Sequence, residues 1–240
     1  MNKEHIAITV VVPAYNEEDN IEPLLQELSA VLNTLNKPYE ILIVDDGSSD
    51  GTKDKLTAAK KKYPELRTIH FRRNHGQTAA IDAGLKKAYG NEIIVIDADL
   101  QSDPADIPLL LSHLKTYDAV CGWRVKRQDT FVKRISSRIA NGFRNWATNE
   151  TIQDTGSSIK AFKRECLSEI KLYNGLHRFL PTLIKLEGYR VGEVQVNHRP
   201  RLKGTSKYNI ANRLFRGLYD LIAVRWMQKR QLRYQEDMYE

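Results

Sequence analysis

Two carboxylates and one amide follow an apolar run near the middle of the sequence. Asp97, Asp99 and Gln101 come directly after the four β-branched residues at 93–96. Such a run predicts a buried strand, so these side chains stand at its carboxyl end, where ligands bind in open α/β sheets. Carboxylate and amide oxygens are ligands of hard cations such as Mg²⁺ and Mn²⁺. The spacing is compatible with a metal site that also admits phosphate oxygens. Taken alone, Asp-Ala-Asp is better explained as a polar strand end, and the residues of the other loops are what favour the metal site.

Strands and helices alternate along the first hundred residues. Strands are predicted at 6–12, 40–44, 67–71 and 92–96, and the first three lead into helices that begin near Ile21, Lys53 and Ala79. This alternation predicts a parallel sheet with right-handed crossovers, whose loops gather at one edge. We therefore expect Glu17, Asp46, Gln77, Asp97 and Asp99 to meet there. The basic turn at 72–78 feeds a helix N-terminus, which suits a phosphate group.

The second half of the sequence continues the α/β pattern. The predicted elements are a helix at 107–114, strands at 117–122 and 159–162, a helix at 164–170, a strand at 188–196 and a helix at 209–233. We divide the chain into a domain at 1–208 and a basic amphipathic helix with its tail at 209–240.

Composition narrows the class of protein. With 240 residues and 41% hydrophobic content, the chain is expected to form one large α/β domain with an appendage. No apolar run approaches the roughly 18 residues that a membrane-spanning helix needs, and the N-terminus lacks the pattern of a signal peptide. A cytoplasmic location is therefore predicted. Cys121 and Cys166 show no metal-binding or redox spacing and are expected to be reduced structural thiols.

Charge divides unevenly between the two halves. Residues 1–121 hold 13 Lys+Arg and 19 Asp+Glu, whereas residues 122–240 hold 24 and 11, a net charge of +13. A basic half of this kind indicates an anionic partner, and nucleic acid, an anionic membrane surface and a phosphorylated substrate all fit. Basic residues cluster at 123–144, where Arg134 and Arg138 stand one helical turn apart, and at 198–208.

The predicted helix at 209–233 has two interpretations. Its apolar stripe is formed by Ile210, Leu214, Leu218, Leu221, Ile222 and Trp226, with basic residues at other positions. Such a stripe usually packs on its own domain. Trp226 beside basic residues equally suits a helix that lies in an anionic membrane interface.

Seven sequence segments resemble the inverting glycosyltransferases of family 2, and within them the dolichol-phosphate mannose synthase and polyprenyl-phosphate glycosyltransferase group. The segments are VVPAYNEEDNI, EILIVDDGSSDGT, RNHGQTAAIDAG, VIDADLQSDP, CGWR, DTGSSIKAF and HRPRLKGTSKY, in the family's order across residues 10–208. DADLQ followed by a distant R-x-x-G-x-SKY is specific to the lipid-phosphate branch. The PxYNE and DDGSxDGT segments are shared by the wider family.

The resemblance implies a GT-A fold over residues 1–208, a mostly parallel sheet flanked by helices. It assigns nucleotide-sugar binding to Pro13, Tyr15, Glu17, Val44, Asp46, Asp97, Ala98, Asp99, Arg124, Arg201 and Lys207, and the convergence of loops adds Gln77. Metal binding, to Mg²⁺ or Mn²⁺, is expected at Asp97, Asp99 and Gln101. Catalytic roles are expected for Asp99, Arg124, Asp154 and Arg201. The acceptor phosphate is assigned to Arg134, Arg138 and Ser206.

The implied reaction transfers a hexose, from GDP-mannose or a UDP-sugar, to dolichyl or undecaprenyl phosphate with inversion. Negative charge develops on the departing nucleoside diphosphate, where a divalent cation and Arg or Lys side chains stabilise it. A phosphate acceptor is already anionic at pH 7, so it needs little deprotonation, and Asp154 would orient or activate it.

Many relatives in this group continue into transmembrane helices that the sequence does not show. We therefore expect a peripheral enzyme at the cytoplasmic face of the membrane, held by its basic helix or by a membrane-embedded protein partner. Two alternatives remain. One is a family 2 enzyme that acts on a saccharide or lipid hydroxyl and needs a general base. The other is a nucleic-acid-binding module, which ranks low because no RNP-like or helix-turn-helix pattern is present; nucleic acid is not an expected partner.

Overall fold

A computed structural model describes residues 5–124, 152–200 and 210–232, with the backbone alone described for 210–216. Within these residues seven strands form one sheet in the order β3-β2-β1-β4-β6-β5-β7. The strands are β1 (Ile8–Ala14), β2 (Tyr39–Asp45), β3 (Leu66–His70), β4 (Glu92–Val95), β5 (Ala119–Arg124), β6 (Lys160–Lys163) and β7 (Val191–Val196). Strands β1 to β4 are mutually parallel, as predicted, and β6 runs antiparallel to both β4 and β5.

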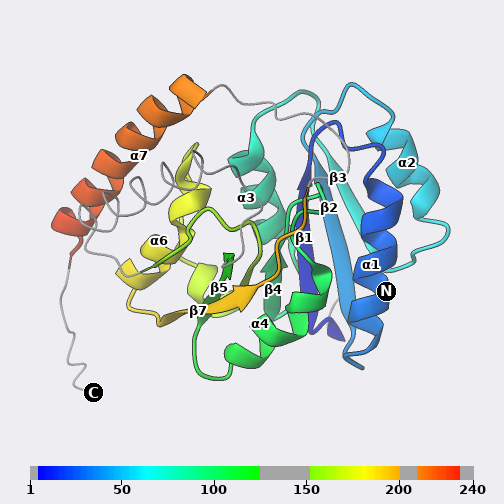
Figure 1. Ribbon diagram of the computed structural model, residues 1–240, viewed down its shortest axis with the longest axis horizontal. Helices are drawn as coiled ribbons and strands as arrows, with labels where there is room; N and C mark the ends of the chain where they lie inside the picture. Colours follow the sequence, from blue (N-terminus) through cyan, green and yellow to red (C-terminus); the bar gives the residue numbers. More distant parts are fainter. Residues whose placement is uncertain (1–4, 125–151, 201–209, 233–240) are drawn as a thin grey trace, which may run out of the picture.

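Helices cover both faces of the sheet (Figure 1). They are α1 (Ile21–Asn33), α2 (Thr52–Ala59), α3 (Gln77–Lys87), α4 (Ile107–His113), α6 (Leu180–Leu186) and α7 (Ile210–Arg230), with 3₁₀ turns η2 (Pro104–Asp106), η3 (Arg164–Leu167) and η4 (Leu176–Phe179). This arrangement confirms the predicted α/β class with a mostly parallel sheet.

The side chains of the strands alternate between the two faces of the sheet, and a separate hydrophobic core lies on each face. Val10 of β1 packs with α1 and α4, whereas its neighbour Val11 packs with α3 and α6. Successive side chains of a strand point to opposite faces, so one apolar run serves both layers. Gly84 allows α3 to approach closely, because a Cβ atom there would lie 2.2 Å from Cγ1 of Val11.

Three predicted elements need correction. Strand β1 continues through Pro13 and Ala14, which pair with Val44 and Asp45, because the φ angle of proline is compatible with a strand. The helix predicted at 164–170 is only the short 3₁₀ turn η3. Helix α6 was not predicted, since seven residues give less than two turns of periodicity.

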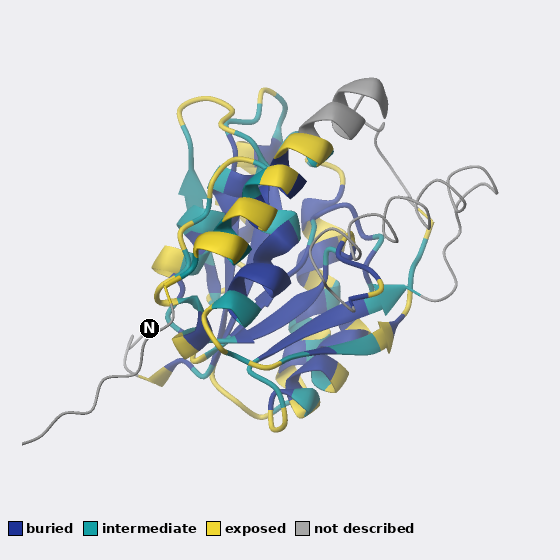
Figure 2. Cartoon of the chain, turned by 90° about the vertical axis from the view of Figure 1, so that its left-hand side faces the viewer, coloured by how far each residue is buried: buried dark blue, intermediate teal, exposed yellow. Residues whose placement is uncertain are grey.

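Helix α7 packs across the outside of η4 and α6 with one narrow face. Leu221 and Val224 are buried against Leu176, Phe179 and Leu183. The predicted stripe is thus divided between the two interpretations: Leu221 packs on the domain, whereas Leu218, Ile222 and Trp226 are exposed. Figure 2 looks onto this side, with exposed positions of α7 facing outward. Among the described residues, no helix combines the length and the apolar character needed to cross a bilayer.

Candidate active site

The first two loops at the carboxyl edge of the sheet are locked to each other. The backbone N–H of Asn16 donates to Oγ of Ser48 at 2.9 Å, and the backbone N–H of Ser49 donates to Oδ1 of Asn16 at 2.8 Å. The backbone N–H of Glu17 donates to Oγ1 of Thr52 at 2.9 Å. Asn16 has a φ of 53°, a left-handed conformation that asparagine tolerates. Hydrogen bonds between side chains and backbone thus fix the loops that follow β1 and β2.

Asp46 fixes the turn that precedes α3. Its Oδ1 accepts the backbone N–H of His75 at 2.7 Å, and its Oδ2 accepts the backbone N–H of Gly76 at 2.8 Å and the side-chain amide of Asn74 at 2.9 Å. Both carboxylate oxygens are therefore engaged by the protein. These contacts give Asp46 a positioning role for the start of α3, and its expected contact with a base stays a prediction.

Gln77, the first residue of α3, reaches the end of β4. Its Nε2 donates to Oδ1 of Asp97 at 2.8 Å. The structure therefore brings together two of the predicted site residues from different loops. Burial, followed by the negative charge of Asp99, raises the pKa of Asp97 to about 6, and Lys160 and hydrogen bonds from Gln77 and Ser158 act in the opposite direction.

The Asp99 loop is held from two sides. Asp99 is buried, and its Oδ1 accepts the backbone N–H of Gln101 at 3.2 Å across Leu100, which has a φ of 59°. The hydroxyls of Ser102 and Ser158 lie 2.8 Å apart. The backbone N–H of Arg199 donates to the carbonyl oxygen of Gln101 at 2.8 Å. The segment that leads into the predicted basic loop is thus tied directly to the expected metal-binding loop.

The residues present fit a divalent cation. Asp97 and Asp99 repel each other strongly enough to contribute to the raised pKa of Asp97, and a cation would relieve this repulsion. Within the described residues no group of three or more His, Cys, Asp or Glu side chains forms a complete metal cage. As ligands, the two carboxylates and the Gln101 amide would leave coordination positions for phosphate oxygens, which is the usual arrangement for Mg²⁺ at phosphate sites.

Arg124 and Asp154, both predicted as catalytic, pair with each other. Nε of Arg124 lies 2.7 Å from Oδ2 of Asp154, and Nη2 lies 3.0 Å from Oδ1, a bidentate contact between two largely buried side chains. Glu193 of β7 accepts the backbone N–H groups of Gln153 and Asp154 and so holds this loop on the sheet. In this structure Asp154 fixes the guanidinium rather than standing ready as a base.

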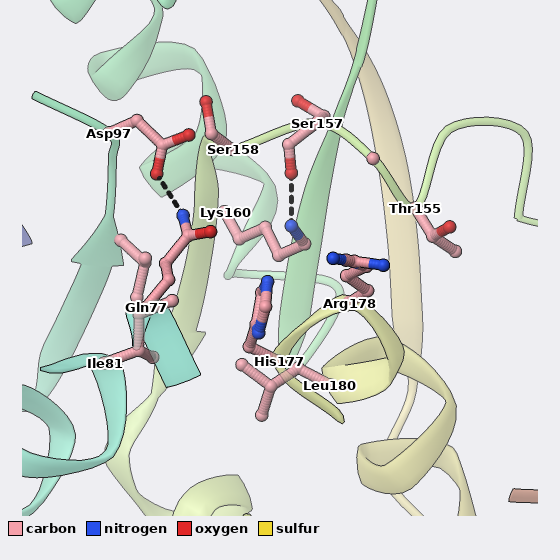
Figure 3. Close-up of a pocket in the computed structure, with 12 residues that line it drawn as sticks. Gln77, Ile81, Asp97, Thr155, Ser157, Ser158, Lys160, His177, Arg178 and Leu180 are labelled. Atoms are coloured by element: carbon pink, nitrogen blue, oxygen red, sulfur yellow. Dashed lines mark hydrogen bonds between the residues drawn. The ribbon is translucent and has the colours of Figure 1, made fainter. Parts of the chain in front are cut away.

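A pocket lies between the end of β4, α3 and η4. Its polar lining includes Gln77, Asp97, Lys160, His177 and Arg178, and Figure 3 shows the Lys160 side chain between the Asp97–Gln77 pair and Arg178. Nζ of Lys160 donates to the carbonyl oxygen of Ser157. Nδ1 of His177 lies 2.7 Å from Oγ1 of Thr78. Burial lowers the pKa of Lys160, although nearby Cys121, Asp97 and Asp154 act in the opposite direction.

Sequence reasoning had not assigned site roles to Lys160, His177 or Arg178. Lys160 lies within the DTGSSIKAF segment, and His177 and Arg178 directly precede an apolar stretch. Two features of the sequence could have identified these pocket residues: a Lys at the start of a strand, and a His-Arg pair beside an apolar stretch.

The remaining predicted residues divide into two groups. Pro13, Val44 and Ala98 are buried at the sheet edge, Tyr15 is half-buried, and Oε2 of Glu17 accepts the side-chain amide of Asn20 at 2.6 Å. Arg134, Arg138, Arg201, Ser206 and Lys207 lie outside the described residues.

Solved structures share this fold. Glucosyl-3-phosphoglycerate synthase from Mycobacterium tuberculosis superposes with a TM-score of 0.69 at 20% identity, covering 93% of this chain and 80% of that one. A mannosyltransferase from Pyrobaculum calidifontis, solved in complex with GDP-Man and Mn²⁺, gives 0.65 at 24% identity, covering 91% and 64%. The GT-A expectation for the fold is confirmed.

Curated relatives and a family model extend the comparison to sequence. A dodecaprenyl-phosphate galacturonate synthase from Rhizobium johnstonii is 36% identical over 94% of this chain and 68% of its own length. An undecaprenyl-phosphate 4-deoxy-4-formamido-L-arabinose transferase from Serratia proteamaculans is 36% identical over 90% of this chain and 66% of its own. The chain thus spans about two thirds of the length of these relatives. The model described as "Glycosyl transferase family 2" matches residues 9–171, and the chain belongs to this family of glycosyltransferases.

Proposed function

We propose that this protein transfers a sugar from a nucleotide sugar to a polyprenyl phosphate with inversion at the anomeric carbon. The observation that carries the proposal is the meeting of Asp97, Asp99 and Gln77 at the carboxyl end of β4, beside the buried Arg124–Asp154 pair. The names of the two curated relatives supply the acceptor class, since both act on a polyprenyl phosphate.

The side chains divide the task between the two substrates. Asp97, Asp99 and Gln101 would hold Mg²⁺ or Mn²⁺, which supplies Lewis-acid stabilisation to a departing diphosphate. A solved neighbour carries GDP-Man and Mn²⁺, and another carries UDP-Glc and Mn²⁺. Pro13, Tyr15, Glu17, Val44, Asp46 and Ala98 would surround the nucleoside. Arg124, with its guanidinium fixed by Asp154, would meet the phosphates together with Arg201 and Lys207.

The acceptor requires little proton chemistry. A phosphate monoester is ionised at pH 7, so the enzyme has to bring two like-charged groups together more than to remove a proton. The engagement of Asp154 by Arg124 agrees with this role. Arg134, Arg138 and Ser206 would neutralise the acceptor phosphate. A saccharide hydroxyl as acceptor would instead require a carboxylate positioned as a base.

Helix α7 would hold the enzyme at the membrane surface. Tyr219, Ile222 and Trp226 are 76%, 62% and 63% exposed, and Arg225 and Lys229 are exposed between and beyond them. Apolar and basic side chains on one exposed surface suit the interface of an anionic bilayer. In this proposal residues 1–208 form the catalytic domain and residues 209–240 the attachment segment, placed at the cytoplasmic face with or without a membrane-embedded protein partner.

The function is tested by nucleotide release. The purified chain is incubated with a panel of UDP- and GDP-sugars and a divalent cation, with and without undecaprenyl or dolichyl phosphate. We expect nucleoside diphosphate release that requires both the cation and the lipid phosphate. Release that depends on a saccharide hydroxyl, with the lipid phosphate without effect, would support the alternative acceptor class instead.

A further inference from the structure

The pocket beneath Asp97 contains a buried cation that the proposed reaction does not use. Lys160 is 6% exposed and begins β6, where it pairs with Val95 of β4 and with Cys121 of β5. Directly paired residues on antiparallel strands point to the same face. Val95 and Lys160 accordingly line the pocket together. The register of the sheet thus fixes the position of Lys160 and places its ammonium group inside the site.

The carboxylates around Lys160 already have other partners. Asp97 bonds Gln77 and would share a divalent cation with Asp99, and Asp154 forms the bidentate pair with Arg124. Across the described part of the chain, no carboxylate oxygen lies within the 4.0 Å of Nζ that defines an ion pair. The bond to the Ser157 carbonyl uses one of the three N–H donors of the ammonium group. Burying a cation in this way is costly unless an anion accompanies it.

The position of the pocket identifies what would enter it. In the proposed function, the nucleoside diphosphate meets the cation held by Asp99, and the sugar ring is covalently attached to the second phosphate. The ring must therefore lie close to Asp99, and Asp97, two residues away, lines the pocket together with the polar groups of His177, Arg178 and Thr155 (Figure 3). A substituent on the ring would then face Lys160.

We infer that the transferred sugar carries a carboxylate, as in a uronic acid, and that Lys160 is the specificity-determining residue that binds it. The inference rests on the proposed function and goes beyond it by naming the class of sugar. A site built around a buried charged group discriminates strongly against an analogue that leaves this group unpaired. A neutral hexose would leave the ammonium group of Lys160 without an anion at ion-pair distance.

Matched donors test the inference in the polyprenyl-phosphate assay. The pairs are UDP-galacturonate with UDP-galactose, UDP-glucuronate with UDP-glucose, and GDP-mannuronate with GDP-mannose, and UDP-4-deoxy-4-formamido-L-arabinose is added as a neutral amide. For the wild type, we expect kcat/KM for one uronate donor to exceed that for its neutral partner at least tenfold. Lys160→Met should reduce this ratio at least tenfold, about 1.4 kcal/mol of discrimination.

Two further variants separate charge from structure. Lys160→Arg keeps a cation in the pocket and should retain the preference for the uronate. Lys163→Met removes a lysine from the same strand, but this lysine pairs with Asp118 outside the pocket, so the ratio should stay at the wild-type value. If Lys160→Met does not fold, the wild-type ratio and the Lys160→Arg ratio still decide the question.

The outcomes distinguish the two proposals. Transfer to the lipid phosphate with equal use of neutral and uronate donors, or an unchanged ratio in folded Lys160→Met, would overturn the inference and leave the proposed function standing. Transfer from the formamido-arabinose donor alone would likewise overturn the inference and leave the proposed function standing. No lipid-linked product from any donor would overturn both.

Discussion

At the scale of single residues, the central feature is the contrast between two acidic side chains, one beside another carboxylate and the other beside a guanidinium. Asp97 is buried beside Asp99, and its pKa rises to about 6, whereas Asp154 is held in a bidentate contact by Arg124. In the proposed function, the first arrangement would favour a bound cation, and the second would fix a guanidinium for an anion. Side chains of similar chemistry would then have separate roles because their surroundings differ.

Removing the Asp99 carboxylate should abolish transfer without unfolding the protein. Asp99→Ala deletes an oxygen ligand for the cation, and we expect kcat/KM to fall on the order of 100-fold or more, about 2.7 kcal/mol. The measurement is transfer rate together with circular dichroism. Asp82→Ala, at a surface pair with Lys86 on α3, is the matched control and should remain active. Undiminished transfer by Asp99→Ala, or by the wild type in EDTA, would contradict the metal assignment.

Cation binding should weaken as the pH falls through about 6. The pKa of Asp97 in the cation-free protein lies above its ordinary value, so below about 6 a proton occupies the carboxylate and competes with the cation. Titration calorimetry with Mn²⁺ at pH 7.5 and at pH 5.5 measures the effect. In Asp97→Asn the affinity should be low and nearly constant between these values. A wild-type affinity that does not change with pH would show that Asp97 does not bind the cation.

The Arg124–Asp154 pair should matter for both stability and activity. Asp154→Asn leaves a largely buried guanidinium without its anion, a change that costs about 3 kcal/mol in comparable sites. Urea unfolding measures the loss, and kcat/KM is expected to fall as well because Arg124 is no longer fixed. The double variant Arg124→Gln/Asp154→Asn should recover part of the stability and none of the activity. Full activity in Asp154→Asn would remove the pair from the mechanism.

The limits of prediction from sequence also appear at this scale. Asp97, Asp99 and Gln77 were identified correctly as neighbours because parallel strands place their loops at one edge. Lys160 was not assigned to the site, because its position depends on the antiparallel register of β6 with β4 and β5. Local sequence contains no signal for that register.

At the scale of elements, long apolar runs and long helices were predictable and short ones were not. β2 and α1 have strong periodic patterns and lie within two residues of their predicted strand limits and helix start. η4 carries His177 and Arg178 into the site and leads directly into α6, yet neither element is long enough to show a period. The packing of α7 was left open between two interpretations, because periodicity identifies a stripe but not the surface against which it packs.

The two faces of α7 predict different results for matched substitutions. Ile222→Ser and Trp226→Ser alter exposed side chains, so the protein should stay folded and lose binding to anionic vesicles. Leu221→Ala and Val224→Ala alter buried ones and should lower the free energy of unfolding, by about 2–4 kcal/mol for Leu221→Ala. Vesicle sedimentation at low and high salt, with urea unfolding, separates these effects. Vesicle binding that survives loss of both exposed side chains would exclude this face as the attachment surface.

At the scale of the whole molecule, charge and fold act together. In the proposed function, the acidic first half would provide the site for a cation and a nucleotide, and the +13 second half would provide charge for the lipid phosphate and the membrane. The sheet joins the two halves, since β6 of the second half lies between β4 and β5. This division explains why composition alone was compatible with several partners, whereas the location of the acidic groups favours a sugar nucleotide.

The product of the reaction tests the central claim most directly. The chain is supplied with a sugar donor that it consumes, a divalent cation and polyprenyl phosphate, and the lipid product is isolated for NMR and mass spectrometry. We predict a sugar joined to the lipid through one phosphate, with an anomeric configuration opposite to that of the donor. A product with retained configuration, a sugar attached to a hydroxyl, or free sugar from hydrolysis alone would contradict the account.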